Sequence, residues 1–283
     1  MIKKLGAETI RPFFVYVDMN FTINLKPYPA AHYFTVQEHA HKYPGNDYTS
    51  EDVQRIEKIL RAFMGLSPDY HFGIVKRSRK DRYMAGFGSV IRKDDPESGI
   101  DYFKEGARLH SGGNILDLSY SFPQINGHLD DFDAVIIDPN MSLGIPSKLV
   151  IVFHKNLSAN KEVFDRDDSD SYSNKDLHLL SGVLADLKAK GLELLIRESN
   201  YKAAVLYQLM DSSERFQAVA PNETRSKTMI VAETSEETAS QISRLGYEIN
   251  EGTKDGAPII SIANYMTHSK ELIEMFSDRI SLL

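Results

Sequence analysis

Five cationic side chains crowd one short stretch of the chain, where they would attract an anion. The run Lys76-Arg77-Ser78-Arg79-Lys80-Asp81-Arg82 follows a short apolar segment, Phe72 to Val75, that we predict to be a buried strand. The turn is bulky and poor in glycine, so its backbone amides cannot cradle a phosphate as a glycine-rich loop does. Three interpretations stay open for Lys76, Arg77 and Arg79: a solvated positive face, a site for phosphate or another small anion, and a nucleic-acid patch.

Histidine side chains cluster nearer the N-terminus, between His32 and His41. His39 and His41 would point to different faces of a helix and would not chelate one ion together. His32, His39 and Asp47 stay conceivable as ligands, but we expect no metal site. The chain has no cysteine, which excludes disulfide scaffolds, cysteine-ligated zinc and iron–sulfur centres.

The composition is that of an ordinary globular protein. The 283 residues are 42% hydrophobic and 26% charged, which suits one large or two modest domains. The net charge of −7 argues against general nucleic-acid binding, and we expect none. No apolar run reaches the roughly 18 residues of a membrane span, and Met1 to Glu8 lacks the apolar core of a signal peptide. We therefore expect a cytoplasmic protein without membrane association.

Strands and helices are expected to alternate and so to position the basic run. Strands are predicted at Phe13–Leu25, Phe72–Val75, Asn114–Tyr120, Ala134–Asp138, Leu149–Phe153, Thr228–Ala232 and Ile259–Ile262. Helices are predicted at Val53–Met64, Leu177–Met210, Glu236–Leu245 and Ser269–Ile280. Short, fully apolar strands are typical of a parallel sheet covered on both faces, and the alternation favours an α/β fold.

Five segments, in order along the chain, resemble one enzyme family. The stretch Ile262-Ala263-Asn264-Tyr265-Met266-Thr267-His268-Ser269-Lys270-Glu271 is similar to the family motif Ile-Ala-Asn-Phe-Pro-Thr-His-Ser-Lys-Glu. The other four segments are Lys26-Pro27-Tyr28-Pro29, Asp133 to Pro146, Arg197 to Ala204 and Thr224 to Thr228. Together they resemble the phosphoserine-aminotransferase-like branch of class V aminotransferases, which are pyridoxal-phosphate enzymes of fold type I.

The resemblance implies a two-part α/β architecture. A reduced large domain with a mostly parallel sheet would span residues 1–190, and a smaller C-terminal α/β domain would span 191–283, with the N-terminal segment packing on it. Only about 40 residues separate the strands at Phe72 and Asn114, too few for the usual seven-stranded large domain. Since relatives are homodimers, the resemblance also implies a homodimer, or a heterodimer with an intact aminotransferase.

Several positions of the family's active site can be compared with this chain. Asp117, in the strand NILDLSY, matches the aspartate that pairs with the pyridine nitrogen. Met141 stands where the family has its cofactor lysine, and a thioether is neither a nucleophile nor a proton carrier. Ser261 stands where the family has the arginine that holds the substrate carboxylate. Lys148 would take over the lysine's role only if its loop were rearranged.

These departures predict that pyridoxal-phosphate-dependent transamination has been lost. We expect no catalytic residue and no cofactor, with pyridoxal phosphate possible only non-covalently beside a vestigial Asp117. The expected function is that of a non-catalytic binding or regulatory partner, or of a protein that binds a small anionic ligand. Candidate residues for such a ligand are Lys76, Arg77, Arg79, Arg225, Lys227 and His268. The alternative is an enzyme, either a phosphoserine-type aminotransferase or a lysine-free activity in the old cofactor cleft.

Overall fold

The computed structural model describes most of the chain from the first predicted helix onward. The described residues are 23–24, 50–85, 87, 89–105, 113–122, 129–145, 147–155 and 174–283. The turn at Lys26–Pro29 and the histidine cluster between His32 and His41, with Asp47, lie outside them. So does all of the strand predicted at Phe13–Leu25 except Ile23–Asn24.

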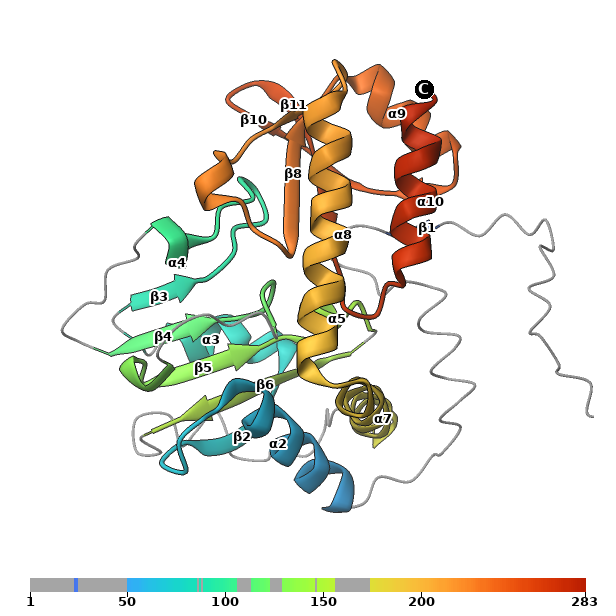
Figure 1. Cartoon of the computed structure of the whole chain (residues 1–283). Helices are drawn as coiled ribbons and strands as arrows, with labels where there is room; N and C mark the ends of the chain where they lie inside the picture. The colour runs from blue at the N-terminus through green and yellow to red at the C-terminus, as the bar shows by residue number, and fades with distance from the viewer. Residues whose placement is uncertain are drawn as a thin grey trace, which may run out of the picture.

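A five-stranded sheet forms the first structural unit (Figure 1). Its order is β2-β6-β5-β4-β3, and only β6 runs opposite to the other four. The strands are β2 (His71–Lys76), β3 (Ser89–Arg92), β4 (Asn114–Asp117), β5 (Ala134–Ile137) and β6 (Leu149–His154). The predicted α/β fold with a mostly parallel sheet is confirmed.

Both faces of the three central strands, β4, β5 and β6, are buried, as their largely apolar residues require. On one face Leu116, Val135 and Ile151 pack in a core with α2 (Ser50–Met64) and α7 (Asn174–Lys190). On the other face Ile115, Ile136 and Val152 pack with Tyr83 of the short helix α3 (Lys80–Met84). The odd and even residues of each strand therefore serve different cores.

Strand β4 is shorter than predicted, because the chain turns after Leu118, whose amide donates to the Ile136 carbonyl of β5 at 2.8 Å. The Ser119 amide donates to Oδ1 of Asp117 at 3.0 Å, and the Ser121 amide donates to the Leu118 carbonyl. These bonds replace the ladder that the apolar pattern predicted as far as Tyr120. The turn puts Asp117 at the carboxyl end of its strand.

The helical region predicted over Leu177–Met210 is two helices, α7 and α8 (Leu192–Ser212). Gly191 separates them with a φ of 89°, a conformation that favours glycine. The first core reaches Leu195 of α8, and a second core begins at Ala203 of the same helix. Helix α8 thus joins the two structural units.

A four-stranded antiparallel sheet forms the second unit, with the order β10-β11-β8-β7. Its strands are β7 (Gln217–Ala218), β8 (Met229–Glu233), β10 (Asn250–Lys254) and β11 (Ala257–Ala263). The helices α9 (Glu236–Arg244) and α10 (Lys270–Ser281) match their predicted ranges closely. Strand β1 (Ile23–Asn24) pairs in parallel with β9 (Tyr247–Glu248) of this unit.

Residues 93–101, after β3, bind the two units together. Lys93, 3% exposed, pairs with Asp94 and Asp101 at 3.2 and 2.9 Å. The Asp101 amide donates to the Thr224 carbonyl at 2.7 Å, and the Ser226 amide donates to the Gly99 carbonyl at 2.8 Å. The composition of residues 93–101 does not predict that they are buried, because their charged side chains neutralise one another only through ion pairs that form on folding. The short helix α4 (Tyr102–Glu105) follows.

Candidate functional site

Two fully buried carboxylates stand at the carboxyl ends of neighbouring parallel strands. Asp117 is the last residue of β4, and Asp138 directly follows β5; both are 0% exposed. The carboxyl ends of parallel strands share one edge of a sheet, which is where α/β proteins bind ligands. A buried carboxylate is stable only with cationic or hydrogen-bonding partners, and each of these two has them.

Lys80 is the principal partner of Asp117. Its Nζ lies 3.1 Å from Oδ2 and 3.4 Å from Oδ1 of Asp117, and it donates to Ser119 Oγ at 2.6 Å. Lys80 is the first residue of α3 and is itself buried, with 8% exposure. Its side chain therefore ends within the sheet edge and not in solvent.

Arg77 is the partner of Asp138. The Arg77 Nε lies 3.0 Å from Asp138 Oδ2, and its Nη1 donates to Asn140 Oδ1 at 2.9 Å. Asp138 also accepts from the Asn140 amide at 3.1 Å, which caps the short helix α5 (Pro139–Leu143). Burial raises the pKa of Asp138, while Arg77 and Lys80 oppose that rise.

Arg92 and two tyrosines lie beside these groups, where the two units meet. Arg92 Nε lies 3.9 Å from Asp117 Oδ2, and its guanidinium lies 5.8 Å from the centre of the Tyr120 ring. Burial raises the pKa of Tyr120 to about 12, with Asp117 and Asp138 raising it and Arg92 and Arg77 lowering it. Tyr120 packs against Tyr265 of the second unit.

We call Arg77, Lys80, Arg92, Asp117 and Asp138 the Asp117 cluster. Its three cations exceed its two carboxylates, so the cluster carries a surplus positive charge if all five groups are ionised. Such a surplus at a sheet edge attracts an anion. The phosphate interpretation of the basic run therefore gains support.

The solvated-face interpretation of the basic run is wrong for the two residues that matter most. Lys80 is buried and Arg77 is half-buried, because Asp117 and Asp138 lie within their reach. Lys76 is the last residue of β2, and Arg79 lies in the short 3₁₀ helix η1 (Arg77–Arg79). No ion pair among the described residues joins either of them to Asp117 or Asp138. Sequence reasoning did not select Lys80, Arg92 or Asp138 as site residues. A buried Asp117 requires a cationic partner, but nothing in the sequence singles out Lys80 among the cations of the basic run.

The two positions at which we expected the sequence to depart from the family's active site lie in α5 and β11. Met141 is a half-buried residue of α5. Ser261, in β11, is 1% exposed, and its Oγ donates to the Pro96 carbonyl at 2.9 Å. Ser261 therefore bonds to the segment that ties the two units together. Lys148 is exposed and precedes β6.

The remaining anion candidates of the sequence have their own partners in the second unit. Arg225 forms two 2.7 Å hydrogen bonds with Asp211 and lies over the Tyr207 ring at 4.6 Å. The half-buried Lys227 receives a 2.8 Å bond from Asn264 on its carbonyl. The buried His268 ring packs edge-on against Tyr265. The structure joins none of the three to the Asp117 cluster by a described hydrogen bond or ion pair.

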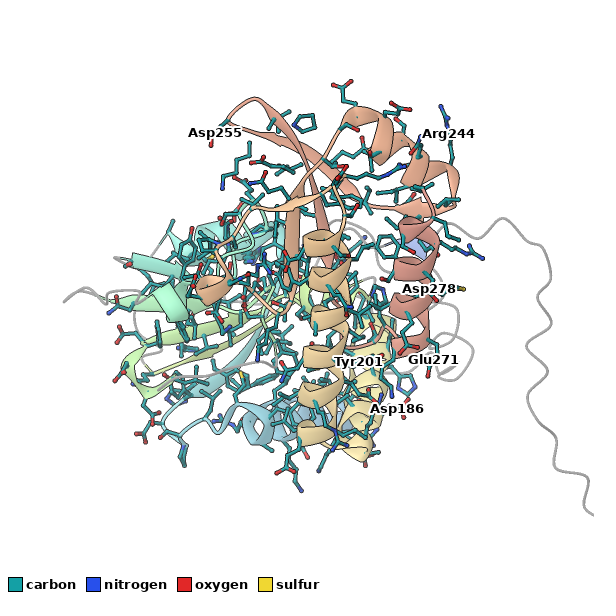
Figure 2. The ribbon with its side chains drawn as sticks, turned by 45° about the horizontal axis from the view of Figure 1, so that its top comes forward. Asp186, Tyr201, Arg244, Asp255, Glu271 and Asp278 are labelled. Carbon is teal, nitrogen blue, oxygen red and sulfur yellow. The ribbon has the colours of Figure 1, made fainter. Side chains whose placement is uncertain are left out.

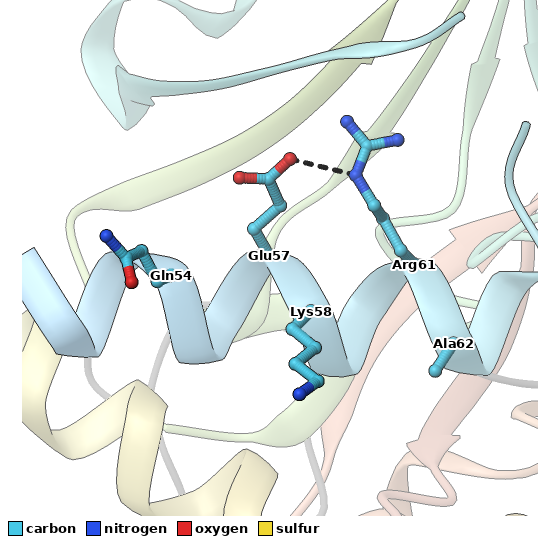
Figure 3. Close-up of a pocket in the computed structure, with 5 residues that line it drawn as sticks. All are labelled: Gln54, Glu57, Lys58, Arg61 and Ala62. Atoms are coloured by element: carbon cyan, nitrogen blue, oxygen red, sulfur yellow. Dashed lines mark hydrogen bonds and ion pairs between the residues drawn. The ribbon is translucent and has the colours of Figure 1, made fainter. Parts of the chain in front are cut away.

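A separate hollow lies on α2, over Gln54, Glu57, Lys58, Arg61 and Ala62 (Figure 3). Glu57 Oε1 accepts a 2.8 Å hydrogen bond from Arg61 Nε within it. The hollow is the solvent side of one helix with an internal ion pair, so we assign it no role. Within the described ranges, no three metal-ligating side chains gather, and no helix is long and apolar enough to cross a membrane.

Comparisons with known proteins identify the fold. No protein-family model and no curated protein matches this sequence. A phosphoserine aminotransferase from Cytophaga hutchinsonii matches with a TM-score of 0.73 at 15% identity, over 92% of this chain and 98% of that one. The fold is that of a phosphoserine aminotransferase. The resemblance seen in the stretch Ile262–Glu271 is thus confirmed as a likeness of fold.

Two further solved structures that match this chain are also aminotransferases. A pyridoxal-phosphate-bound phosphoserine aminotransferase from Trichomonas vaginalis has a TM-score of 0.69 at 8% identity, over 92% of this chain and 99% of that one. A ureidoglycine–glyoxylate aminotransferase from Bacillus subtilis has a TM-score of 0.67 at 10% identity, over 92% of each chain.

These neighbours contradict the expectation that no cofactor is used. The Trichomonas protein, which shares this fold, was solved with pyridoxal phosphate bound. The expectation was wrong because it rested on departures from the family motifs at positions such as Met141 and Ser261, whereas the fold is one that a pyridoxal-phosphate-bound protein shares. The expectation that the chain is not an enzyme likewise finds no support, since the neighbours are aminotransferases.

The residues of the Asp117 cluster fit the charged ends of pyridoxal phosphate. Asp117 is a buried carboxylate of the kind that holds a protonated ring nitrogen, and Arg77 and Lys80 are cations of the kind that bind a phosphate. Met141 provides no amine for covalent attachment. The cluster therefore has the chemistry to hold the cofactor by ion pairs.

Proposed function

We propose that this chain is an aminotransferase-like protein that binds pyridoxal phosphate at the Asp117 cluster. The observation that carries the proposal is a fully buried carboxylate, Asp117, at the carboxyl end of a central parallel strand, surrounded by surplus positive charge. The cofactor-bound neighbour with the same fold supports this choice of ligand.

Each residue of the cluster has a definite part in the proposal. Asp117 would pair with the ring nitrogen, and Arg77 and Arg79, which follow β2, would face the phosphate. When bound, pyridoxal phosphate supplies an electron sink for reactions at the carbon that bears an amino group. Asp138 holds Arg77 in place through its 3.0 Å ion pair. Tyr120 and Tyr265 close the cluster on the side of the second unit.

Binding is tested with purified protein and pyridoxal phosphate. We would record absorbance from about 300 to 500 nm and measure the dissociation constant by equilibrium dialysis, before and after borohydride. The Asp117→Asn variant should bind at least about 10-fold more weakly, because loss of one charge-assisted contact costs more than about 1.4 kcal/mol. Unfolding curves show whether the variant still folds.

A matched control lies on the outer helix of the second unit. Asp278 is exposed on α10, as Figure 2 shows, and Asp278→Asn should leave the dissociation constant unchanged. No change in absorbance and no saturable binding by the wild type would refute the proposal. Equal affinity of wild type and Asp117→Asn would refute the role of Asp117.

A second candidate function rests on Met141 and Ser261, which replace the two groups that family chemistry needs most. In this candidate the protein is a non-catalytic partner, either of a second copy or of an intact aminotransferase, and its cluster binds a small anion. Native mass spectrometry of the chain with and without such an aminotransferase tests the partnership. Saturable binding of inorganic phosphate without pyridoxal-phosphate binding would favour this candidate.

A further inference from the structure

We propose that Lys80 is a built-in competitor of the cofactor, whose ammonium group occupies the cation position at Asp117 until a ligand displaces it. The inference rests on the proposed function, because it concerns the same cluster. It goes further by naming the residue that controls entry to the site and the kind of ligand that can displace it.

The contacts of Asp117 leave little room for a further cation. Oδ1 accepts the Ser119 amide at 3.0 Å and the Ser119 hydroxyl at 2.5 Å, and lies 3.4 Å from Lys80 Nζ. Oδ2 accepts no hydrogen bond from a described residue, but the Lys80 ammonium lies 3.1 Å from it and Arg92 Nε lies 3.9 Å from it. A carboxylate offers about four acceptor positions, so Oδ2 is where a ring nitrogen must approach. The Lys80 ammonium is the cation nearest to that oxygen.

The ammonium group of Lys80 and a protonated pyridine nitrogen are alternative cationic partners for Asp117. Both carry a single positive charge and donate N–H hydrogen bonds, the ammonium three and the pyridinium one. A pyridinium would be a third cation at the oxygen that Lys80 and Arg92 already face, and the three would repel one another in surroundings that screen charge poorly. Occupation of Asp117 by Lys80 and by a pyridinium is therefore mutually exclusive.

Lys80 can leave Asp117 because its side chain is flexible: a stem of about four carbons joins the amine to the backbone. The residue is the first of α3, directly after the 3₁₀ helix that holds Arg77 and Arg79. An ammonium group that leaves Asp117 cannot remain buried without a new partner. A phosphate placed near Arg77 and Arg79 would provide that partner.

The ligand that fits must therefore carry two opposite charges. Its ring cation takes Asp117 from Lys80, and its phosphate receives the displaced Lys80. Pyridoxal without the phosphate offers no such exchange, so the intact cluster should bind it more weakly. The exchange makes Lys80 a specificity-determining residue for phosphorylated pyridines.

The first test uses variants of the full chain and equilibrium dialysis against pyridoxal phosphate and against pyridoxal. Lys80→Ser removes the competing cation and keeps a small hydroxyl, so it should bind pyridoxal, which offers the displaced ammonium no phosphate, at least about 10-fold more tightly than wild type, equivalent to about 1.4 kcal/mol. Lys58→Ser, on the exposed face of α2, is the matched control and should bind like wild type. Pyridoxal should gain more than pyridoxal phosphate from Lys80→Ser.

The second test uses the wild type, so that a folding defect of the variant cannot decide the matter. Amine-reactive labelling followed by peptide mass spectrometry reports the accessibility of each lysine. Lys80 should label slowly in the free protein and faster once pyridoxal phosphate is added, while the labelling of Lys58 stays constant.

The outcomes separate this inference from the proposed function. If wild type binds, and neither Lys80 labelling nor the Lys80→Ser affinity changes, the competition is refuted and the proposed function stands. If Lys80→Ser binds and wild type does not, the competition holds and the proposed function falls. If neither binds, both fall. A borohydride-fixed adduct on Lys80, with binding lost in Lys80→Ser, would also refute competition, because Lys80 would then be the attachment point.

Discussion

The close approach of Gly144 to Tyr265 allows a stability prediction to be worked out in detail. Gly144 ends α5 with a φ of 65°, and a Cβ built there would lie 2.8 and 2.9 Å from two carbons of the Tyr265 ring. In Gly144→Ala the left-handed backbone costs about 1–2 kcal/mol. The clash adds about 1–3 kcal/mol for overpacking. We expect a total loss of about 2–5 kcal/mol in the free energy of unfolding.

Gly65 provides a matched control for the backbone contribution. Its φ of 63° is nearly the same, and nothing lies within 4 Å of the place that a Cβ would take. Gly65→Ala should therefore lose only the backbone cost of about 1–2 kcal/mol. The gain from a less flexible unfolded chain is common to both variants and cancels in their difference. That difference isolates the contact with Tyr265.

Urea unfolding at constant pH measures both variants. A Gly144→Ala, Tyr265→Leu double variant closes a mutant cycle, and its loss should be smaller than the sum of the two single losses. Equal losses for Gly144→Ala and Gly65→Ala would refute the reasoning. So would strict additivity in the cycle, because it would mean that the ring moves aside at no cost.

Three further predictions concern other side chains. Burial lowers the pKa of Lys202 from 10.5 to about 7, so the unfolded chain binds the proton more tightly between these values. Stability should then rise with pH from about 7 to about 10, by up to a few kcal/mol, and Lys202→Met should flatten this slope in urea unfolding. Met141→Lys should yield a borohydride-fixed pyridoxal-phosphate adduct on residue 141, found by peptide mass spectrometry, if residue 141 stands in the lysine position. Asp211→Asn should cost at most about 1 kcal/mol, since its bond to Arg225 is exposed, and raised salt should shrink even that loss.

Local pattern predicted most of the elements well. The strands β2, β5 and β6 and the helices α2, α9 and α10 begin and end within about three residues of their predicted bounds, a usual precision for boundaries. Their apolar residues recur with the period of the structure they form. The likeness of five segments to family motifs implied a two-part architecture, which periodicity alone does not provide.

Pairings between distant charges could not be predicted from the sequence. Lys80 stands in a run that looks solvent-exposed, and its partner Asp117 lies 37 positions further along the chain. Lys93, Asp94 and Asp101 are buried because they neutralise one another, which a list of polar residues does not reveal. In both cases the topology of β3 and β4 decides which charges meet. Asp117 was predicted as a site residue without knowledge of its ion-pair partners, because that prediction used only its position in a strand and its likeness to a family motif.

Helix α8 has a mechanical consequence for access to the Asp117 cluster. Each of its 21 residues adds about 1.5 Å to the length of the helix. The helix contacts one core at Leu195 and the other core as far as Met210. Tilting one unit against the other would pull Leu195 from its packing or break the bonds of Gly99 and Asp101. We expect the two units to move as one rigid body. Ligands would then enter through rotation of side chains where the units meet, without a hinge motion between the units.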